Sequence, residues 1–325
     1  TDLGEYIVQL AGQGPSHVTA PALHLSRQQI GEIFARRLGI PYSDDPHVLM
    51  EAARTRLRER YLTAGAGITG VNFAAADSGT LVVVENEGNG GLSASVPPVH
   101  IALMGMEKLI PRLRDLPVFL AVLARSATGQ RLTTYTHHFL GPLPAGHLYC
   151  VVVDAGRSRM LADPRLREAL YCIRCGACLN VCPVYRRAGG LAYGSTYAGP
   201  IGSVITPQLR GGIAAAQLPY ASSLCGACKQ ECPVMIDLPH QLVYLRHKAV
   251  RETRYAHSQE RWMLRAFAWC MRRPWAYGLA SSLVRALLPH TSAQHALVPG
   301  LRRWTRRRRL PAPPAQSFKQ WWQRR

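Results

Sequence analysis

The segment Cys172-Ile-Arg-Cys175-Gly-Ala-Cys178-Leu-Asn-Val-Cys182-Pro183 determines how the second half of the chain must be organised. Its C-x2-C-x2-C-x3-C-P spacing lets a short loop supply three thiolates to one cubane iron–sulfur cluster and the fourth thiolate to a neighbouring cluster. Thiolates suit this role because iron–sulfide clusters take soft, anionic donors. Structural zinc is the alternative, but a zinc site needs two C-x2-C pairs closed into a tetrahedron and gives the final Cys-Pro no role. The spacing therefore predicts an iron–sulfur site.

A second group of cysteines, Cys225-x2-Cys228-x3-Cys232-Pro233, aligns with the last three cysteines of the first group, and Ser222 stands where a fourth would be. Cross-ligation of the kind found in two-cluster ferredoxins predicts one ligand set per cluster. Cluster 1 is expected to take Cys172, Cys175, Cys178 and Cys232, and cluster 2 to take Cys182, Cys225 and Cys228. The remaining position of cluster 2 stays open between an oxygen of Ser222, another group or water, and a missing corner iron. A loop serine that binds no iron is favoured, because hydroxyl ligation is uncommon.

Periodicity divides the chain into three parts. Residues 1–160 alternate between helical and strand patterns, with helices expected at 26–38, 46–62 and 106–124 and strands at 70–75, 81–85, 100–104, 132–138 and 148–154. Ser26 should cap the first helix, Val48 should face the core of the second, and Pro111 and Pro117 should end or kink the third. Residues 183–224 form too long a spacer for a tight β-hairpin ferredoxin, so clusters held between helices are expected. Further helices are predicted at 164–171 and 239–251. The fold class is thus an α/β part at 1–160, an α-helical two-cluster ferredoxin-type domain at 161–253 and a basic C-terminal region at 254–325.

Charge is concentrated at one end of the chain. The net charge is +20, yet residues 246–325 hold 18 Lys and Arg against two acids, which leaves residues 1–245 nearly neutral. Charge-free segments are interrupted by glycine, proline or arginine, so no bilayer span is expected. No basic segment followed by an apolar segment begins the chain, so no secretory signal is expected. Cysteines gathered in two tight groups indicate metal binding in a reducing compartment, which favours a cytoplasmic location.

Several motifs together resemble the lactate utilisation protein B family. They are Tyr171-Cys-Ile-Arg-Cys-Gly-Ala-Cys-Leu-Asn-Val-Cys-Pro-Val-Tyr185, Gly70-Val-Asn-Phe73, Gly79-Thr-Leu-Val-Val-Val-Glu-Asn-Glu-Gly-Asn89, Pro97-Pro-Val-His-Ile-Ala-Leu-Met-Gly105 and Gly156-Arg-Ser-Arg159, with the Trp321-Trp322 ending. The resemblance extends over nearly the whole chain. It implies an iron–sulfur subunit of an L-lactate-oxidising system, with two 4Fe-4S clusters that relay electrons from lactate oxidation. It also implies that the three-cysteine second group is the family's own pattern.

The resemblance carries further expectations. Residues 1–160 would be the C-terminal portion of a lactate-utilisation (LUD) domain, similar to the fold of sugar-phosphate isomerases and CoA transferases, with more of that domain ahead of Thr1. The partners would be other subunits of the lactate-utilisation system and an unidentified electron acceptor. Because the sequence offers no credible flavin or nicotinamide site, the chain is not expected to be catalytic alone. The alternatives are an iron–sulfur nucleic-acid-binding or regulatory protein that uses the basic tail, and a scaffold with a purely structural cluster.

Four weaker signals each have a structural explanation as the alternative to a functional one. Gly65-x-Gly67-x-x-Gly70 matches a dinucleotide fingerprint, but it follows a helix and enters a strand, the reverse of the required order. The polar loop at residues 85–89 is either a site at a sheet edge or, as favoured, a turn that needs Gly and Asn. His137 and His138 alternate on a strand, so only one can face inward, and a satisfied or solvent-exposed histidine is expected. Cys150 and Cys270 are expected to pack as small apolar residues.

The basic C-terminal region has three interpretations. A solvated or disordered tail is favoured, since runs of charge are usually solvated. Contact with an acidic partner or an anionic membrane surface comes next, because tryptophans interleave with arginines there, and peripheral membrane contact through the tail is therefore one expectation. Nucleic acid is the least favoured partner.

Overall fold

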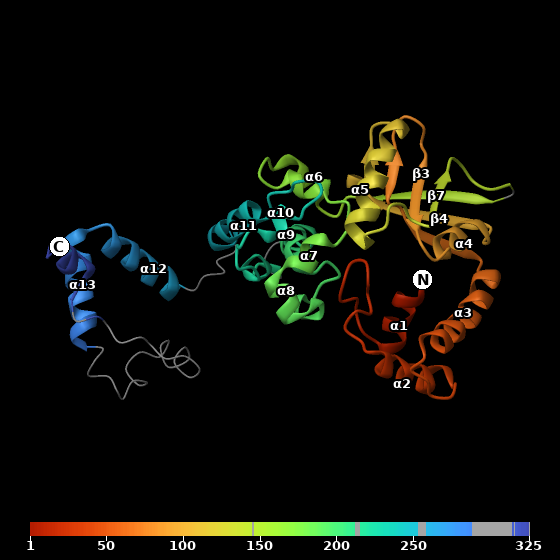
Figure 1. The fold of residues 1–325 in the computed structure, drawn as a ribbon. Helices are drawn as coiled ribbons and strands as arrows, with labels where there is room; N and C mark the ends of the chain where they lie inside the picture. Colours follow the sequence, from red (N-terminus) through yellow and green to blue (C-terminus); the bar gives the residue numbers. More distant parts are fainter. Residues whose placement is uncertain (145, 212–214, 253–257, 288–313, 315, 325) are drawn as a thin grey trace. The chain divides into compact units, whose positions relative to one another are not determined.

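The computed structural model describes residues 1–144, 146–211, 215–252, 258–287, 314 and 316–324. The chain forms two compact units, Thr1–Tyr255 and Ala256–Arg325, and each is described by itself (Figure 1). The first unit contains an N-terminal group of helices, a pair of β-sheets and the cysteine-rich helical part. The second contains separate C-terminal helices.

Three helices open the first unit: α1 (Leu3–Ala11), α2 (Arg27–Leu38) and α3 (Pro46–Thr63). The expected cap of α2 is confirmed, because Ser26 and Gln29 form a reciprocal capping box. Asp45 caps α3, where Pro46 takes the first helical position. Phe34 and Leu49 lie in the shared core of these helices. The inward placement of Val48 is wrong: its side chain is 47% exposed, since the adjacent Leu49 turns to the core instead.

Two sheets follow. Strands β1 (Ala66–Gly70), β4 (Val99–Gly105) and β7 (His147–Val153) form a parallel sheet in the order β1-β4-β7. Strands β5 (Leu109–Ile110), β2 (Phe73–Ala75), β3 (Leu81–Glu85) and β6 (Tyr135–Phe139) form a mixed sheet in that order. Helix α4 (Asn89–Ser95) connects β3 to β4, and α5 (Leu116–Thr128) packs its Leu116 and Leu123 on the mixed sheet (Figure 1). The predicted α/β character of this part is confirmed.

The structure corrects four details of this region. The strand expected at 70–75 divides at Val71 and Asn72 into β1 and β2, which belong to different sheets. The helix expected at 106–124 begins only at Leu116, after two 3-10 turns, η1 (Met106–Lys108) and η2 (Leu113–Asp115), and strand β5. Pro117 lies in the first turn of α5, where a missing N–H costs nothing, so it starts the helix rather than kinking it. Cys150 is exposed rather than packed, because β7 is an edge strand with little covering its faces.

The cysteine-rich part is helical, as predicted. Its elements are α6 (Arg157–Ala162), η3 (Arg167–Tyr171), α7 (Ala177–Val181), α8 (Pro183–Ala188), η4 (Gly190–Tyr193), α9 (Gly199–Leu209), η6 (Leu218–Tyr220), α10 (Ala227–Gln230) and α11 (Leu238–Glu252). The helix expected at 164–171 is only the 3-10 turn η3. Helix α9 is central, since its residues 199–207 are all buried, and Leu179, Val204 and Leu242 share one core.

The second unit contains α12 (Ser258–Met271), α13 (Pro274–Leu287) and α15 (Phe318–Gln323). Helices α12 and α13 contact each other, with Trp269 and Trp275 in an edge-to-face arrangement at 5.6 Å. Within the described part of the chain, no helix combines the length and the apolar composition that crossing a membrane requires. The arginine run 306–309 lies outside the described residues.

Candidate iron–sulfur site

Two loops of the same backbone conformation present the two groups of cysteines. In the first, Arg174 (φ 66°) precedes Cys175 and Gly176 (φ 79°) opens α7, while in the second, Leu224 (φ 57°) precedes Cys225 and Gly226 (φ 87°) opens α10. The left-handed conformation suits glycine at the second of these positions. Helices α7 and α10 contact each other, so the loops meet although residues 183–224 separate them in sequence (Figure 1).

All seven predicted ligand residues lie in this region, and several of them lie near enough to affect one another's pKa. Cys175 interacts with Cys172 and Cys232. Cys228 interacts with Cys182 and Cys225. Cys178 interacts with Cys172 and Cys175, and also with Cys228 of the other set. The two groups of cysteines therefore lie beside each other, and the division of the seven ligands between two clusters stays a prediction.

The buried thiols of this site resist ionisation while they have no cation between them. Burial, followed by the neighbouring thiolates, raises the pKa of Cys178 far above its usual range and that of Cys228 to about 11. Burial also raises the pKa of Cys175. A bound metal centre lowers these pKa values again, because coordinated thiols lose their protons outright. The cysteines thus suit a cationic metal centre as their partner.

Backbone N–H groups point at several of the sulfurs. Ile201 N, in the first turn of α9, hydrogen-bonds to Cys178. Tyr185 N donates to Cys182 Sγ at 3.5 Å, and Ile236 N donates to Cys232 Sγ at 3.3 Å. The cap residue of α9, Ala198, has no side chain able to satisfy the helix terminus. The positive end of a helix and amide donors both favour anionic sulfur, and hydrogen bonds to sulfur are one means of setting cluster potential.

Two buried polar atoms beside the cysteines lack a hydrogen-bond partner among the described residues, Arg174 Nη1 and the Tyr193 hydroxyl. Burial, then the charges of Cys182 and other nearby groups, raises the pKa of Tyr193 to about 12, so the hydroxyl stays a donor. Unsatisfied buried donors are costly and call for an acceptor. An anionic iron–sulfur cluster is such an acceptor, so the residues present fit the group that the sequence implies.

The described residues contain no site for a single metal ion. No three His, Cys, Asp or Glu side chains within the described ranges lie close enough together to bind one ion. Each thiolate of a cubane cluster binds a different iron, so the cysteines need not converge on one point.

Ser222, at the place of the missing cysteine, is engaged by its own loop. Its Oγ accepts the N–H of Leu224 at 3.1 Å, and its carbonyl accepts from Arg246 Nη2 at 2.9 Å. This arrangement is that of a turn-forming serine, which agrees with the favoured interpretation of a serine that binds no iron.

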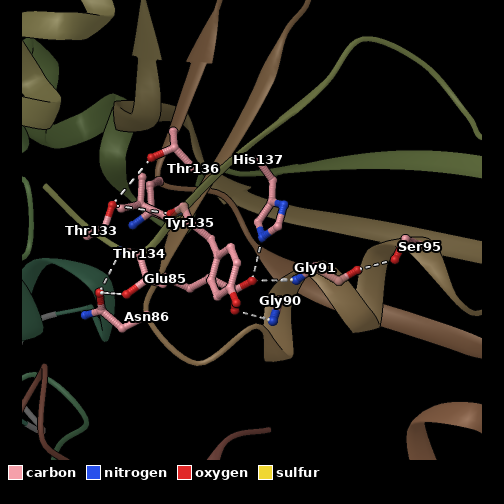
Figure 2. A network of polar contacts seen from close by, with 12 residues as sticks. Glu85, Asn86, Gly90, Gly91, Ser95, Thr133, Thr134, Tyr135, Thr136 and His137 are labelled. Atoms are coloured by element: carbon pink, nitrogen blue, oxygen red, sulfur yellow. Dashed lines mark hydrogen bonds and ion pairs between the residues drawn. The ribbon is translucent and has the colours of Figure 1, made fainter.

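A second polar network lies in the α/β part (Figure 2). The Glu85 carboxylate accepts from Gly90 N at 2.5 Å, Gly91 N at 2.7 Å and His137 Nε2 at 2.6 Å. A Cβ at Gly91 would lie 2.7 Å from the His137 ring, so glycine is needed for this close approach. The Glu85 carboxylate thus connects β3 to the start of α4. These contacts fit the favoured interpretations, in which the loop is a turn that needs Gly and Asn and His137 is a satisfied histidine. Gly65-x-Gly67-x-x-Gly70 follows α3 and runs through β1, whereas a dinucleotide site needs the motif after a strand and at the start of a helix.

Comparison with known proteins assigns three segments. Residues 1–157 match the LUD domain, residues 168–236 match the 4Fe-4S dicluster domain, and residues 245–325 match the C-terminal region of lactate utilisation protein B. Lactate utilization protein B of Oceanobacillus iheyensis is 45% identical over 100% of this chain and 70% of that protein. The protein of the same name from Bacillus thuringiensis is 43% identical over 99% of this chain and 70% of its own length.

A crystal structure of a DUF162 family protein from Deinococcus radiodurans covers 46% of this chain and 94% of its own at 21% identity. Its TM-score is 0.25.

Proposed function

The chain belongs to the lactate utilisation protein B family, and on that premise we propose that it is the electron-transfer subunit of an L-lactate-oxidising system. It is an iron–sulfur protein of lactate utilisation with two 4Fe-4S clusters. Oxidation of lactate to pyruvate releases two electrons and two protons, whereas each cluster holds one electron at a time. Two adjacent clusters can therefore pass the pair in single steps to an acceptor.

The observation that carries this proposal is the meeting of the two cysteine loops. We assign Cys172, Cys175, Cys178 and Cys232 to cluster 1, and Cys182, Cys225 and Cys228 to cluster 2. The support is the spacing together with the pattern of interacting thiols. The protein residues around the clusters orient the thiolates, donate hydrogen bonds to sulfur and exclude water. We place lactate oxidation itself on partner subunits of the same system, with an acceptor of unidentified chemistry.

The test is iron and sulfide analysis with low-temperature EPR on anaerobically purified protein. We expect about eight iron per chain and a coupled signal after dithionite reduction. Cys175→Ala should lower the iron content by about half and abolish lactate-dependent electron transfer in the reconstituted system. Cys150→Ala is the matched control, because this exposed cysteine lies outside both groups. Zinc in place of iron, or full electron transfer by Cys175→Ala, would refute the proposal.

We also propose a cytoplasmic location with peripheral contact to membranes. Helices α12 and α13 expose large apolar side chains, among them Trp262, Phe267, Trp275 and Leu279, beside several arginines. Exposed aromatic and basic residues on short helices suit an anionic lipid surface. All six tryptophans lie in residues 256–325, so their fluorescence reports on this unit alone.

A blue shift of this fluorescence with phosphatidylglycerol vesicles, absent with phosphatidylcholine vesicles, is the expected result. No shift with either would reject membrane contact. Salt-sensitive binding to nucleic acid instead would favour the alternative function of a nucleic-acid-binding protein.

A further inference from the structure

A buried carboxylate in the α/β part binds two arginines, one at the start of α6 and one in the first cysteine loop. The Glu107 side chain is 2% exposed. It accepts from Arg157 Nε at 2.5 Å and from Arg174 Nη2 at 3.0 Å, and both arginine side chains are at least 86% buried. Although burial raises its pKa, the charges of Arg174 and Arg157 more than compensate and hold the Glu107 pKa below its usual value. One carboxylate thus faces two guanidinium groups, which leaves a surplus of positive charge.

Arg174 places this surplus charge in the first cysteine loop. It lies between Cys172 and Cys175, its guanidinium covers the Tyr197 ring at 4.7 Å, and its Nη1 is one of the buried donors with no partner among the described residues. A guanidinium is not deprotonated in proteins, so Arg174 stays a cation although its side chain is only 14% exposed.

The second cysteine loop shows that the fold does not need an arginine here. Leu224 occupies the equivalent position, one residue before Cys225, with nearly the same left-handed backbone (φ 57° against 66°). Loop geometry therefore fails to explain Arg174, and its buried charge distinguishes the two loops. The alternative is that the ion pair between Glu107 and Arg174 only joins the α/β part to the cysteine-rich part. A redox titration separates this structural role from an effect of the arginine charge on cluster 1.

We propose that Arg174, held in place by Glu107, raises the reduction potential of cluster 1 as a positioning and charge-bearing residue rather than a ligand. Reduction adds one negative charge to an already anionic centre, and a nearby buried cation stabilises the reduced state more than the oxidised state. The inference rests on the ligand set proposed above for cluster 1.

The experiment is an EPR-monitored redox titration of the full chain with both clusters loaded. Arg174→Leu copies the second loop and removes the charge. We expect its cluster 1 to become harder to reduce by about tenfold, which is about 59 mV for a one-electron couple. Arg174→Lys keeps the charge and should recover most of the shift. Arg187→Leu, which removes an exposed arginine of the same domain, should leave the potential unchanged.

An unchanged potential in Arg174→Leu with full iron content would overturn this inference and leave the proposed function intact. A wild-type protein without iron would instead overturn the proposed function. If Arg174→Leu fails to load cluster 1, Arg157→Leu removes the other buried charge without altering the cysteine loop. A smaller shift in the same direction is then expected, and no shift would overturn the inference.

Discussion

Glu107→Gln should strongly destabilise the first unit. The carboxylate is almost fully buried and pairs with two buried arginines, so its neutral replacement leaves their positive charges uncompensated. Removing one partner of a buried ion pair costs about 3–5 kcal/mol. The glutamine amide keeps one oxygen that can still accept from one arginine, so we expect a loss near the lower end, about 3 kcal/mol. At roughly 2–4 °C per kcal/mol, the midpoint of thermal unfolding should fall by about 6–12 °C.

The assay is urea and thermal unfolding of the anaerobic, cluster-loaded protein followed by far-UV circular dichroism. Glu51→Gln is the matched control, because Glu51 also pairs with an arginine, Arg54, but both side chains are more than 60% exposed. Exposed pairs contribute roughly 0–1 kcal/mol, so this control should unfold close to the wild type. If the two variants unfold within about 0.5 kcal/mol of each other, the argument from burial is refuted.

Three other expectations test the fold. The pKa of Glu107 is lowered from the ordinary value of 4.5, so the stability that its carboxylate provides is complete above pH 4.5 and is lost as the pH falls through the lowered pKa. Urea midpoints measured against pH should show this loss in the wild type and not in Glu107→Gln. Gly190→Ala would place a Cβ 1.6 Å from the Ser16 carbonyl oxygen and should cost about 2 kcal/mol or more, whereas Gly14→Ala meets nothing within 4 Å and should be nearly neutral in the same assay. Ser26→Ala removes a capping box and should cost about 1 kcal/mol, and a wild-type urea midpoint in this variant would contradict the cap.

Features set by neighbouring residues could be predicted from the sequence. Ser26 and Pro46 mark the starts of α2 and α3 by local capping chemistry. The C-x2-C-x2-C-x3-C-P spacing acts within one loop, so it identified the ligand candidates. Features that depend on distant contacts were missed. Whether residues 109–110 form a strand is decided by their pairing with β2, and whether Cys150 is covered is decided by the place of β7 at the sheet edge.

The contacts of the charged residues around the cysteines also could not be predicted from the sequence. Arg174 could be noticed in the sequence between two ligand candidates, but its partner Glu107 lies 67 residues away. The Tyr193 hydroxyl and the Ile201 N–H come near the sulfurs only because η4 packs on α8 and α9 packs on α7. Spacing therefore predicts which residues bind a cluster, whereas the groups that would set its potential come from tertiary packing.

The two cysteine loops differ in their access to solvent, which bears on the direction of the proposed relay. Cys175, a proposed ligand of cluster 1, is 7% exposed and shares a core with Ile173, whereas Cys225, a proposed ligand of cluster 2, is exposed beside the buried Cys182 and Cys228 of the same set. A partner protein can therefore approach the second loop more closely than the first. A cluster deep beside Arg174 suits electron storage within the chain, and one beside Cys225 suits exchange with an external acceptor. On this argument the proposed relay exchanges electrons with its acceptor on the side of Cys225, where a cluster 2 ligand reaches the surface.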